Sequence, residues 1–339
     1  MRRAPTILDV ASEAGVSKST VSNVIRGSSA VAEATRHRVL LAVEQLGYRP
    51  NVIARNLVQR QTSVFGVVVG DLGNPFYAEM AKHVEREAAQ RGFRAMFCNT
   101  QGDDGTVLSS VESMLEHRVA GLVFLATSGD QVQLRDSVGD RVPTVFVSCP
   151  SDWGDVVCAD DRGGAEIATQ HLIDLGHQRI VYLADPIVED AADRNRQSGY
   201  RQAMQRAQLT PVVVHWARTS GDLLPASIDG KVAQILSDGT TAVFSSNDLG
   251  AIELLECADR LGVHVPEDLS VVGFDDVVMA GLARISLTTV RQPKRELARL
   301  AVEMLAARAG GDVTGRPIRR TVDVELVVRR STSAVRTAA

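Results

Sequence analysis

A short predicted helix near the start of the chain carries polar side chains on one face. They are Lys18, Ser19, Ser22, Asn23 and Arg26. Hydroxyl, amide, ammonium and guanidinium groups are the donors and acceptors that base edges and phosphates require. The opposite face carries Val21, Val24 and Ile25 at the spacing of a packed helix face. The pattern indicates a helix that binds nucleic acid. The alternative is the solvated face of an ordinary three-helix unit.

The first fifty residues predict three short helices around this polar face. Thr6 is a good N-cap for the first helix, and Asp9 can complete a capping box. Ser17 caps the second helix, and the third begins near Glu33 and stops at Gly47. The other apolar residues expected to pack inward are Val10, Ala11, Ala14, Val39, Val43 and Leu46. This arrangement is typical of a helix-turn-helix, whose second helix enters the major groove of DNA.

A second candidate contact lies in residues 52–59, after the break at 48–51. The segment has helical potential, but eight residues cannot hold a helix alone in water, so it needs a docking partner. Arg55 and Arg60 are basic, and Leu57 is an exposed apolar residue of the kind that wedges between base steps in the minor groove. The alternative is a plain linker with Leu57 packed on the neighbouring domain.

The charge of the chain is divided unevenly between its parts. The formal net charge is −4, from 37 Lys and Arg against 41 Asp and Glu. Nine basic and four acidic residues give +5 over residues 1–60, and the other 28 basic and 37 acidic residues give −9. This asymmetry indicates a basic nucleic-acid or membrane module joined to an acidic soluble body.

From Val64 onward, short apolar runs alternate with longer amphipathic stretches. The predicted strands are 64–70, 93–98, 121–126, 143–148, 179–184, 212–216, 241–246 and 270–275. The predicted helices are 76–91, 104–118, 163–176, 194–208, 226–237, 248–262 and 294–309. The alternation predicts an α/β fold of two doubly wound parallel-sheet halves, four strands each, joined near 160–164. Such halves bind ligand in a cleft at the carboxyl ends of their strands.

Polar residues directly after the predicted strands are therefore candidates for ligand contact. An Asp or Asn at such a position is often only the N-cap of the next helix. The residues for which capping is expected are Asn74, Asp103 and Asp161. Those for which ligand contact and capping stay open alternatives are Asn247, Asp248 and Asp275.

Two blocks of the first sixty residues are specific enough to indicate a family. ILDVASEAGVSKSTVS (7–22) and TRHRVLLAVEQLGYRPN (35–51), followed by ARNL (54–57), resemble the N-terminus of the LacI/GalR family of bacterial transcription regulators. The resemblance implies base contacts from Lys18, Ser19, Asn23, Ala54 and Leu57. It implies phosphate contacts from Thr6, Ser17, Ser22, Arg26, Thr35, Asn51 and Arg55. Paired hinge segments imply a homodimer on a near-palindromic double-stranded DNA operator.

The body carries the same resemblance in DLGNPFYAEM (71–80), SSND (245–248), VPEDLSVVGFDD (265–276) and LTTVRQP (287–293). It implies an effector domain like a periplasmic sugar-binding protein. The effector contacts that it implies are Phe76, Tyr77, Arg196, Asn247, Asp275 and Gln292. Arg196 would donate to the hydroxyls of a polyol and Asp275 would accept from them.

The resemblance also implies domain boundaries. Residues 1–50 would form the helix-turn-helix domain, 51–61 a hinge helix and linker, and 62–339 the effector-binding and dimerisation domain. One subdomain of the body would take about 62–162 and 292–321, and the other about 163–291 and 322–330.

Three positions depart from the sugar-responsive members of the family. Leu223 stands where many of them carry an aromatic residue that stacks on the sugar, and Ser148-Cys149 stands at an acidic or polar position. Residues 189–193 replace a serine-bearing loop. The aromatic residues that could supply stacking instead are Phe76, Tyr77 and Trp153. A sugar is the expected effector, and a nucleobase-like or other small metabolite is the alternative.

Motifs typical of other protein classes are missing from the sequence. No phosphate loop, dinucleotide fingerprint, zinc-protease motif or nucleophile elbow occurs, so an α/β enzyme acting on a small metabolite is the weaker alternative. The four scattered cysteines fit buried thiols in a reducing cytoplasm, and neither a metal nor a cofactor is expected. No apolar run reaches the ~18 residues of a membrane span, and the start lacks an apolar signal segment. We therefore expect a cytoplasmic protein without membrane contact rather than a transport binding protein.

Overall fold

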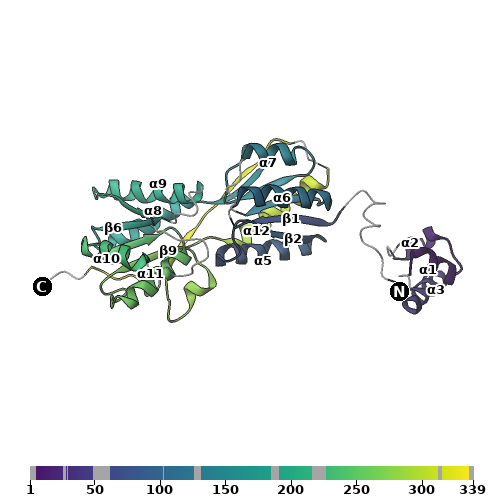
Figure 1. Ribbon diagram of the computed structural model, residues 1–339, viewed down its shortest axis with the longest axis horizontal. Coiled ribbons are helices and arrows are strands. Elements are labelled where there is room, and N and C mark those ends of the chain that lie inside the picture. Colours follow the sequence, from purple (N-terminus) through teal and green to yellow (C-terminus); the bar gives the residue numbers. More distant parts are fainter. Residues whose placement is uncertain are drawn as a thin grey trace. The chain divides into compact units, whose positions relative to one another are not determined.

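The computed structural model describes residues 5–25, 28, 30–48, 62–101, 103–125, 131–184, 191–215, 227–311 and 315–335. The chain divides into two compact units, Met1–Thr62 and Ser63–Ala339 (Figure 1).

The first unit packs three short helices around a small apolar core. They are α1 (Ile7–Glu13), α2 (Lys18–Ile25) and α3 (Glu33–Leu46). The backbone N–H of Thr6 donates to Asp9 Oδ2 at 2.7 Å, and the Thr6 hydroxyl caps the Asp9 N–H in return. The buried core comprises Val10, Ala11, Ala14, Val21, Val24, Val39 and Ala42, with Val43 and Leu46 packed against it. The three predicted helices and the capping box are confirmed.

The second unit has two lobes, each built on a six-stranded sheet. The sheet of the first lobe has the order β11-β5-β4-β3-β1-β2, and all neighbouring strands are parallel. Its strands are β1 (Val64–Val69), β2 (Arg94–Asn99), β3 (Gly121–Leu125), β4 (Thr144–Val147), β5 (Asp155–Ala159) and β11 (Arg319–Val322). The central strands are buried on both faces, which is why their sequences are almost continuously apolar.

The sheet of the second lobe has the order β12-β10-β9-β8-β6-β7. Its strands are β6 (Ile180–Ala184), β7 (Val212–His215), β8 (Ala242–Ser245), β9 (Ser270–Asp275), β10 (Thr288–Arg291) and β12 (Glu325–Val327). Neighbouring strands are parallel except that β12 is antiparallel to β10.

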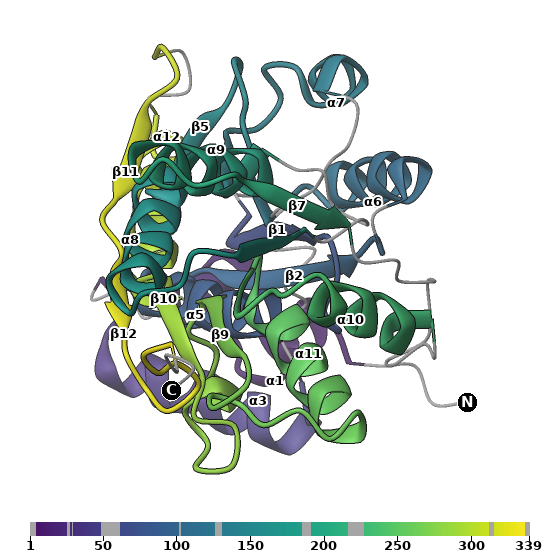
Figure 2. The same cartoon turned by 90° about the vertical axis from the view of Figure 1, so that its left-hand side faces the viewer.

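Helices cover both faces of each sheet (Figures 1 and 2). In the first lobe, α5 and α12 pack together on one face, while α6 and α7 pack on the other. In the second lobe, α8 and α9 cover one face and α10 and α11 the other. The bounds are α5 (Pro75–Gln90), α6 (Asp104–Glu116), α7 (Gln131–Val138), α8 (Asp161–Asp174), α9 (Ala191–Arg206), α10 (Ser227–Ser237), α11 (Asp248–Arg260), α12 (Lys294–Ala309) and the 3-10 helix η1 (Val278–Gly281).

Three connections between described elements join the lobes. They run from β5 to α8, from β10 to α12 and from β11 to β12. The carboxyl ends of β4, β8 and β9 therefore come within reach of one another and of the N-terminus of α5.

The eight predicted strands are confirmed to within one residue at each end, and the seven predicted helices to within three. The sheets have six strands each and not the predicted four. The additional strands are β5, β10, β11 and β12. These strands have three to five residues, and both β11 and β12 lie at sheet edges with exposed positions, so they lack a long apolar run.

Two of the three predicted caps are confirmed, and one prediction is wrong. Asn74 accepts a hydrogen bond from the Phe76 N–H, and Asp103 accepts one from the Thr106 N–H. The cap of α8 is Asp160, which accepts from the Gly163 N–H at 2.9 Å. Asp161 is instead a buried residue of the first turn. In the sequence, either of the two adjacent aspartates could be the N-cap. The structure decides between them, because α8 already begins at Asp161.

Candidate functional site

A pocket lies at the carboxyl ends of the strands in both sheets. It is lined by Asn74, Phe76, Tyr77, Ser148, Ala192, Asp193, Arg196, Ser246, Asn247 and Asp275. The first four belong to the first lobe, at the start of α5 and directly after β4. The others belong to the second lobe, at the start of α9 and at the ends of β8 and β9. The pocket therefore has one wall on each lobe, which is the position expected for a ligand of this fold.

A buried guanidinium organises the wall on the second lobe. Arg196 Nε donates to Asp161 Oδ1 at 2.8 Å, and Nη1 donates to the Ser246 carbonyl at 2.6 Å. The Nη2 atom lies 3.8 Å from Asp275 Oδ1. The guanidinium also lies over the ring of Phe274, 3.8 Å from its centroid. Burial raises the pKa of the Asp161 carboxyl, and the neighbouring Arg196 opposes that rise.

Asp275 is the carboxylate that faces this guanidinium at the end of β9. Burial raises its pKa to about 6, while Arg196, a hydrogen bond from Gln292 and the Lys294 charge act in the opposite direction. Gln292 Nε2 donates to Asp275 Oδ1 at 2.7 Å. The carboxyl group is thus mostly ionised at neutral pH and can accept hydrogen bonds from a ligand. Asp275 lines the pocket and caps no described helix, so ligand contact remains as the prediction for this residue.

The remaining expected contacts reach the pocket from helix starts. Asn247 caps α11 by accepting from the Gly250 N–H at 2.8 Å, and it also lines the pocket, so the cap is confirmed and ligand contact stays a prediction. Phe76 and Tyr77 form an edge-to-face pair with ring centroids 5.3 Å apart. They are the aromatic side chains among the described lining residues.

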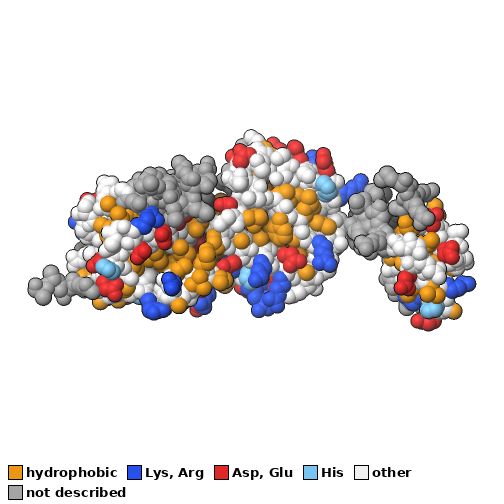
Figure 3. Space-filling model, turned by 60° about the horizontal axis from the view of Figure 1, so that its bottom comes forward, with side chains coloured by type: hydrophobic (Ala, Val, Ile, Leu, Met, Phe, Trp, Pro, Cys, Tyr) orange, Lys and Arg blue, Asp and Glu red, His pale blue; other side chains and the backbone are white. Residues whose placement is uncertain are grey.

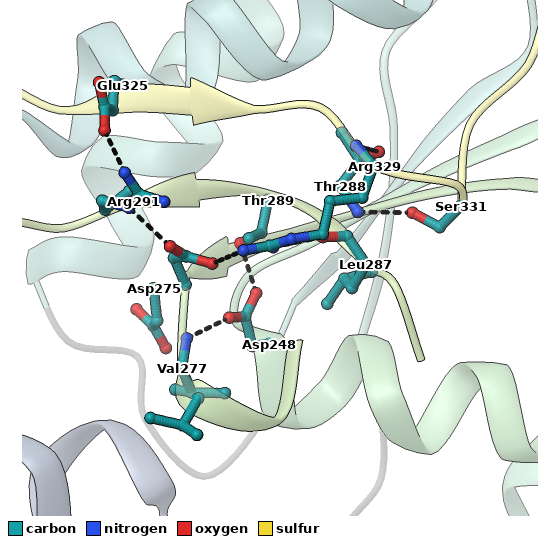
Figure 4. A network of polar contacts seen from close by, with 12 residues as sticks. Asp248, Asp275, Val277, Leu287, Thr288, Thr289, Arg291, Glu325, Arg329 and Ser331 are labelled. Carbon is teal, nitrogen blue, oxygen red and sulfur yellow. Dashed lines mark hydrogen bonds and ion pairs between the residues drawn. The ribbon is translucent and has the colours of Figure 1, made fainter. Parts of the chain in front are cut away.

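Gln292, Asp248 and Trp153 lie outside the described lining of the pocket. Gln292 reaches it only through Asp275, and its Oε1 is buried without a hydrogen-bond partner. Asp248 is fully buried and accepts from the Val277 N–H at 2.8 Å and from the Thr289 hydroxyl (Figure 4). Burial raises the pKa of Asp248 well above its usual value, and the nearby Asp275 adds to the rise. Trp153 packs edge-on against Phe146 in the apolar core of the first lobe.

Five lining residues were not predicted as contacts: Asn74, Ser148, Ala192, Asp193 and Ser246. Ser148 has a left-handed backbone with φ of 57°, and its buried Oγ has no hydrogen-bond partner. Its position directly after β4 is the signal available in the sequence, where Ser148 stands out only as a departure from the family. Asp193 accepts from the Tyr182 hydroxyl at 2.6 Å, a contact that joins a strand to a helix and leaves no local pattern in sequence.

The candidate DNA-binding residues of the first unit lie around α2. Lys18 and Ser19 are exposed, whereas Ser22 and Asn23 are half-buried. Ser17 caps α2 by accepting from the Thr20 N–H at 3.1 Å. Thr6 and Thr35 are half-buried beside the starts of α1 and α3. The residues Arg26, Asn51, Ala54, Arg55, Leu57 and Leu223 lie outside the described part of the chain.

Two further features are absent from the described residues, a metal cluster and a membrane-spanning helix. No three His, Cys, Asp or Glu side chains there could together hold a metal ion. No helix in the described ranges is long and apolar enough to cross a membrane.

Comparison with known proteins agrees with this architecture. The model of bacterial regulatory proteins of the lacI family matches residues 6–51, and that of the periplasmic binding protein-like domain matches residues 169–332. The ribose operon repressor of Escherichia coli strain K12 is 37% identical over 311 residues, which cover 89% of this chain and 92% of the relative. The repressor PurR of Photobacterium profundum is 35% identical over 335 residues, covering 96% and 98%.

Among solved structures, a lac repressor dimer bound to operator and the anti-inducer ONPF superposes with a TM-score of 0.85. It is 28% identical, and the match covers 98% of this chain and 100% of that one. The chain belongs to the LacI family of bacterial regulatory proteins. It has the family's fold, an N-terminal helix-turn-helix head followed by a two-lobed α/β body, as the sequence resemblance predicted. The relatives are named as transcriptional repressors.

Proposed function

We propose that this DNA-binding regulator is a repressor that binds a near-palindromic operator as a homodimer and changes its DNA affinity when a sugar or sugar derivative occupies the pocket. The observation that supports this most strongly is the pocket itself. One wall carries a guanidinium and a carboxylate, Arg196 and Asp275, and the other carries Phe76 and Tyr77. Charged hydrogen-bonding groups facing an aromatic wall suit a polyol, whose edges are polar and whose faces are apolar.

The ligand contacts follow from the donors and acceptors in the pocket. Arg196 donates to ligand hydroxyls, and Asp275 accepts from them. Asn247 supplies a further amide, and Gln292 positions Asp275. Ser148 contributes a hydroxyl from the first lobe, where its Oγ has no protein partner. A ligand that satisfies this hydroxyl and Arg196 together would connect the two lobes.

The DNA contacts follow from the exposed face of α2. Lys18, Ser19 and Asn23 would contact base edges. The phosphate contacts would come from Thr6, Ser17, Ser22, Arg26, Thr35, Asn51 and Arg55. Ala54 and Leu57 would enter the minor groove from a hinge at 51–61, between a head at 1–50 and a body at 62–339. In the body, 62–162 with 292–321 and 163–291 with 322–330 would move as the two subdomains.

The homodimer is supported by exposed apolar surface on the body. Val278 is 74% exposed and Leu282 53% exposed, although both are large hydrophobic residues. Figure 3 shows broad hydrophobic areas on the visible face of this unit. Contiguous apolar surface of this kind marks interaction sites. The dimer would work in the cytoplasm, without a cofactor, metal or membrane.

A ligand screen followed by operator binding tests the proposal. Purified protein is heated with D-ribose, other sugars, nucleobases and sugar phosphates. A ligand at about a hundred times its Kd should stabilise the fold by roughly 2.7 kcal/mol. The operator is selected from a random DNA library, and its affinity is measured with and without the best ligand. A ligand that raises the melting temperature but leaves operator affinity unchanged contradicts the proposed regulation. If a nucleobase is the only ligand that raises the melting temperature, the proposal of a sugar effector is wrong.

A further inference from the structure

We propose that Glu79 and Lys294, which do not line the pocket, position the turn at 275–278 and fasten the two lobes to each other. This inference deepens the proposed function, because it assigns the link between ligand and lobe angle to two residues. Both lie in the first lobe, Glu79 on α5 and Lys294 at the start of α12. We call their contacts with the turn the lobe latch.

The latch has a direct hydrogen bond between the lobes. Glu79 Oε1 accepts from the backbone N–H of Val278 at 2.8 Å. Val278 begins η1 in the second lobe, whereas α5 packs on β1, β2 and β3 of the first lobe. The other oxygen of the same carboxylate, Oε2, lies 3.2 Å from Lys294 Nζ. A single side chain thus connects an amide of one lobe with a cation of the other.

Lys294 extends the latch to the pocket residue Asp275. Its Nζ donates to the Asp275 carbonyl at 2.8 Å and to the Asp276 carbonyl at 2.7 Å. With Glu79 as third partner, the three N–H donors of the ammonium group are matched by three acceptors. The Lys294 side chain is only 9% exposed, so water cannot easily replace a lost partner.

The turn requires such support because its backbone is strained. Asp275 has φ of 122° and Asp276 has φ of 51°, values that side-chain-bearing residues rarely adopt. The Asp276 carboxylate accepts from Arg291 and Arg329, each at 2.6 Å, and this network continues to Glu325 (Figure 4). Those contacts are made within the second lobe and its connections. Lys294 and Glu79 add the contacts from the first lobe.

The latch and the pocket share the same two elements. The first two turns of α5 carry Phe76 and Tyr77 to the pocket and Glu79 to the latch. The turn at the end of β9 carries Asp275 to the pocket and Val278 to the latch. Movement of one pocket wall away from the other must therefore lengthen the Glu79–Val278 bond. A ligand held by both walls and an intact latch favour the same lobe arrangement, so each stabilises the other.

The test measures the distance between the lobes in the full chain, without ligand or DNA. Spin labels are attached to cysteines at Asp136→Cys on α7 and Arg201→Cys on α9, both exposed positions. Cys98 and Cys158, the two partly exposed thiols, are replaced by serine, whereas Cys149 and Cys257 are buried. Dilution with unlabelled protein keeps the measured pairs within one chain. The distance distribution is recorded by double electron–electron resonance.

Glu79→Ala removes the latch carboxylate at a helix position that tolerates alanine. We expect its distribution to shift to longer distances and to broaden relative to the parent. Glu85→Ala is the matched control, because Glu85 is an exposed glutamate on the same helix. Its distribution should match the parent. Identical distributions for Glu79→Ala and the parent overturn the proposal, and so does an equal shift in the control.

Lys294→Gln provides a second variant, in case one substitution impairs folding. It should shift the distribution in the same direction, and the double variant should add little, because the two residues act through one turn. Additive shifts would overturn the shared mechanism. Circular dichroism melting identifies any unfolded variant before labelling. Since neither ligand nor operator is used, failure of this test is separate from failure of the proposed effector or operator.

Discussion

The head and the pocket place their functional side chains in opposite environments. Lys18 and Ser19 are exposed on a helix whose other face packs on small aliphatic residues. Arg196 and Asp275 are 8% and 3% exposed, and each is held by protein partners. Exposed side chains of the head such as Lys18 and Ser19 can therefore be exchanged with little effect on folding. A residue of the pocket contributes to ligand binding and to the stability of the body at once.

The largest expected effect comes from a substitution among the buried residues of the pocket. Arg196→Met should lower the free energy of unfolding by about 3–5 kcal/mol, because it leaves the buried Asp161 without its cation. Arg206→Met on the same helix is the control, since Arg206 is 53% exposed and its pair with Glu166 is worth at most about 1 kcal/mol. Urea unfolding measures both. Equal losses would show that burial of the pair does not matter.

A substitution at an exposed residue of the head should reduce the specificity of DNA binding and leave the stability of the protein unchanged. Lys18→Ala should reduce discrimination at one operator base pair by about 1–3 kcal/mol. Its free energy of unfolding should stay within about 0.5 kcal/mol of the parent, since the side chain is exposed. Affinities for an operator series with single base changes give the first quantity. An unchanged base preference would show that Lys18 contacts a phosphate instead of a base. The control is Arg38→Ala, at an exposed position of α3.

A third prediction concerns pH. The pKa of Asp275 is raised to about 6, so a ligand that donates to its carboxylate should bind best well above pH 6, where the group is ionised. Affinity should fall by up to about tenfold per pH unit below that value. The contribution of this group to the free energy of unfolding has the opposite pH dependence, because its folded pKa exceeds the ordinary value of 3.8. That contribution is present below pH 3.8 and is lost as pH rises through about 6.

Calorimetric titration of the ligand at pH 5, 6, 7 and 8 measures this dependence. Asp275→Asn should weaken binding and flatten its pH profile. A parent profile that stays flat from pH 5 to pH 8 would show that the ligand does not use the Asp275 carboxylate.

The smallest expected effect comes from removing a pocket hydroxyl that has no hydrogen-bond partner in the protein. Ser148→Ala should leave the free energy of unfolding unchanged or slightly higher, because the Oγ has no hydrogen bond to lose. Ligand affinity should fall by about 1 kcal/mol when the hydroxyl contacts the ligand. Ser109→Ala, on the exposed side of α6, is the control. Unchanged ligand affinity would remove Ser148 from the contacts, and a large loss of stability would show that it supports the fold.

The sequence predicted most of the fold because the signals were local. Apolar runs such as that of β1 and the capping box of Thr6 with Asp9 depend on neighbours within a few residues. The missed strands β11 and β12 are short, exposed at sheet edges and paired with strands from distant parts of the chain. Their identity depends on a partner, and no local pattern carries that information.

The candidate site shows the same division. Arg196, Asn247 and Asp275 were expected from family motifs, and the structure brings all three to one pocket. Ser148 is not among the expected contacts, because a lone serine after a strand has no motif of its own. The sequence predicts Asp161 as a cap, although its carboxylate is buried against Arg196, 35 residues further along the chain.

The sequence by itself determined the class of protein, the three helices of the head, the alternation of the body and the division of charge between them. Helix periodicity, capping and turn chemistry act over a few residues, so they can be recognised in one dimension. Only the tertiary structure decided which polar residues meet. The contacts of Glu79 with Val278 and of Lys294 with Asp275 join residues 199 and 19 positions apart. They exist because two sheets and three connections bring the starts of α5 and α12 together with one strained turn.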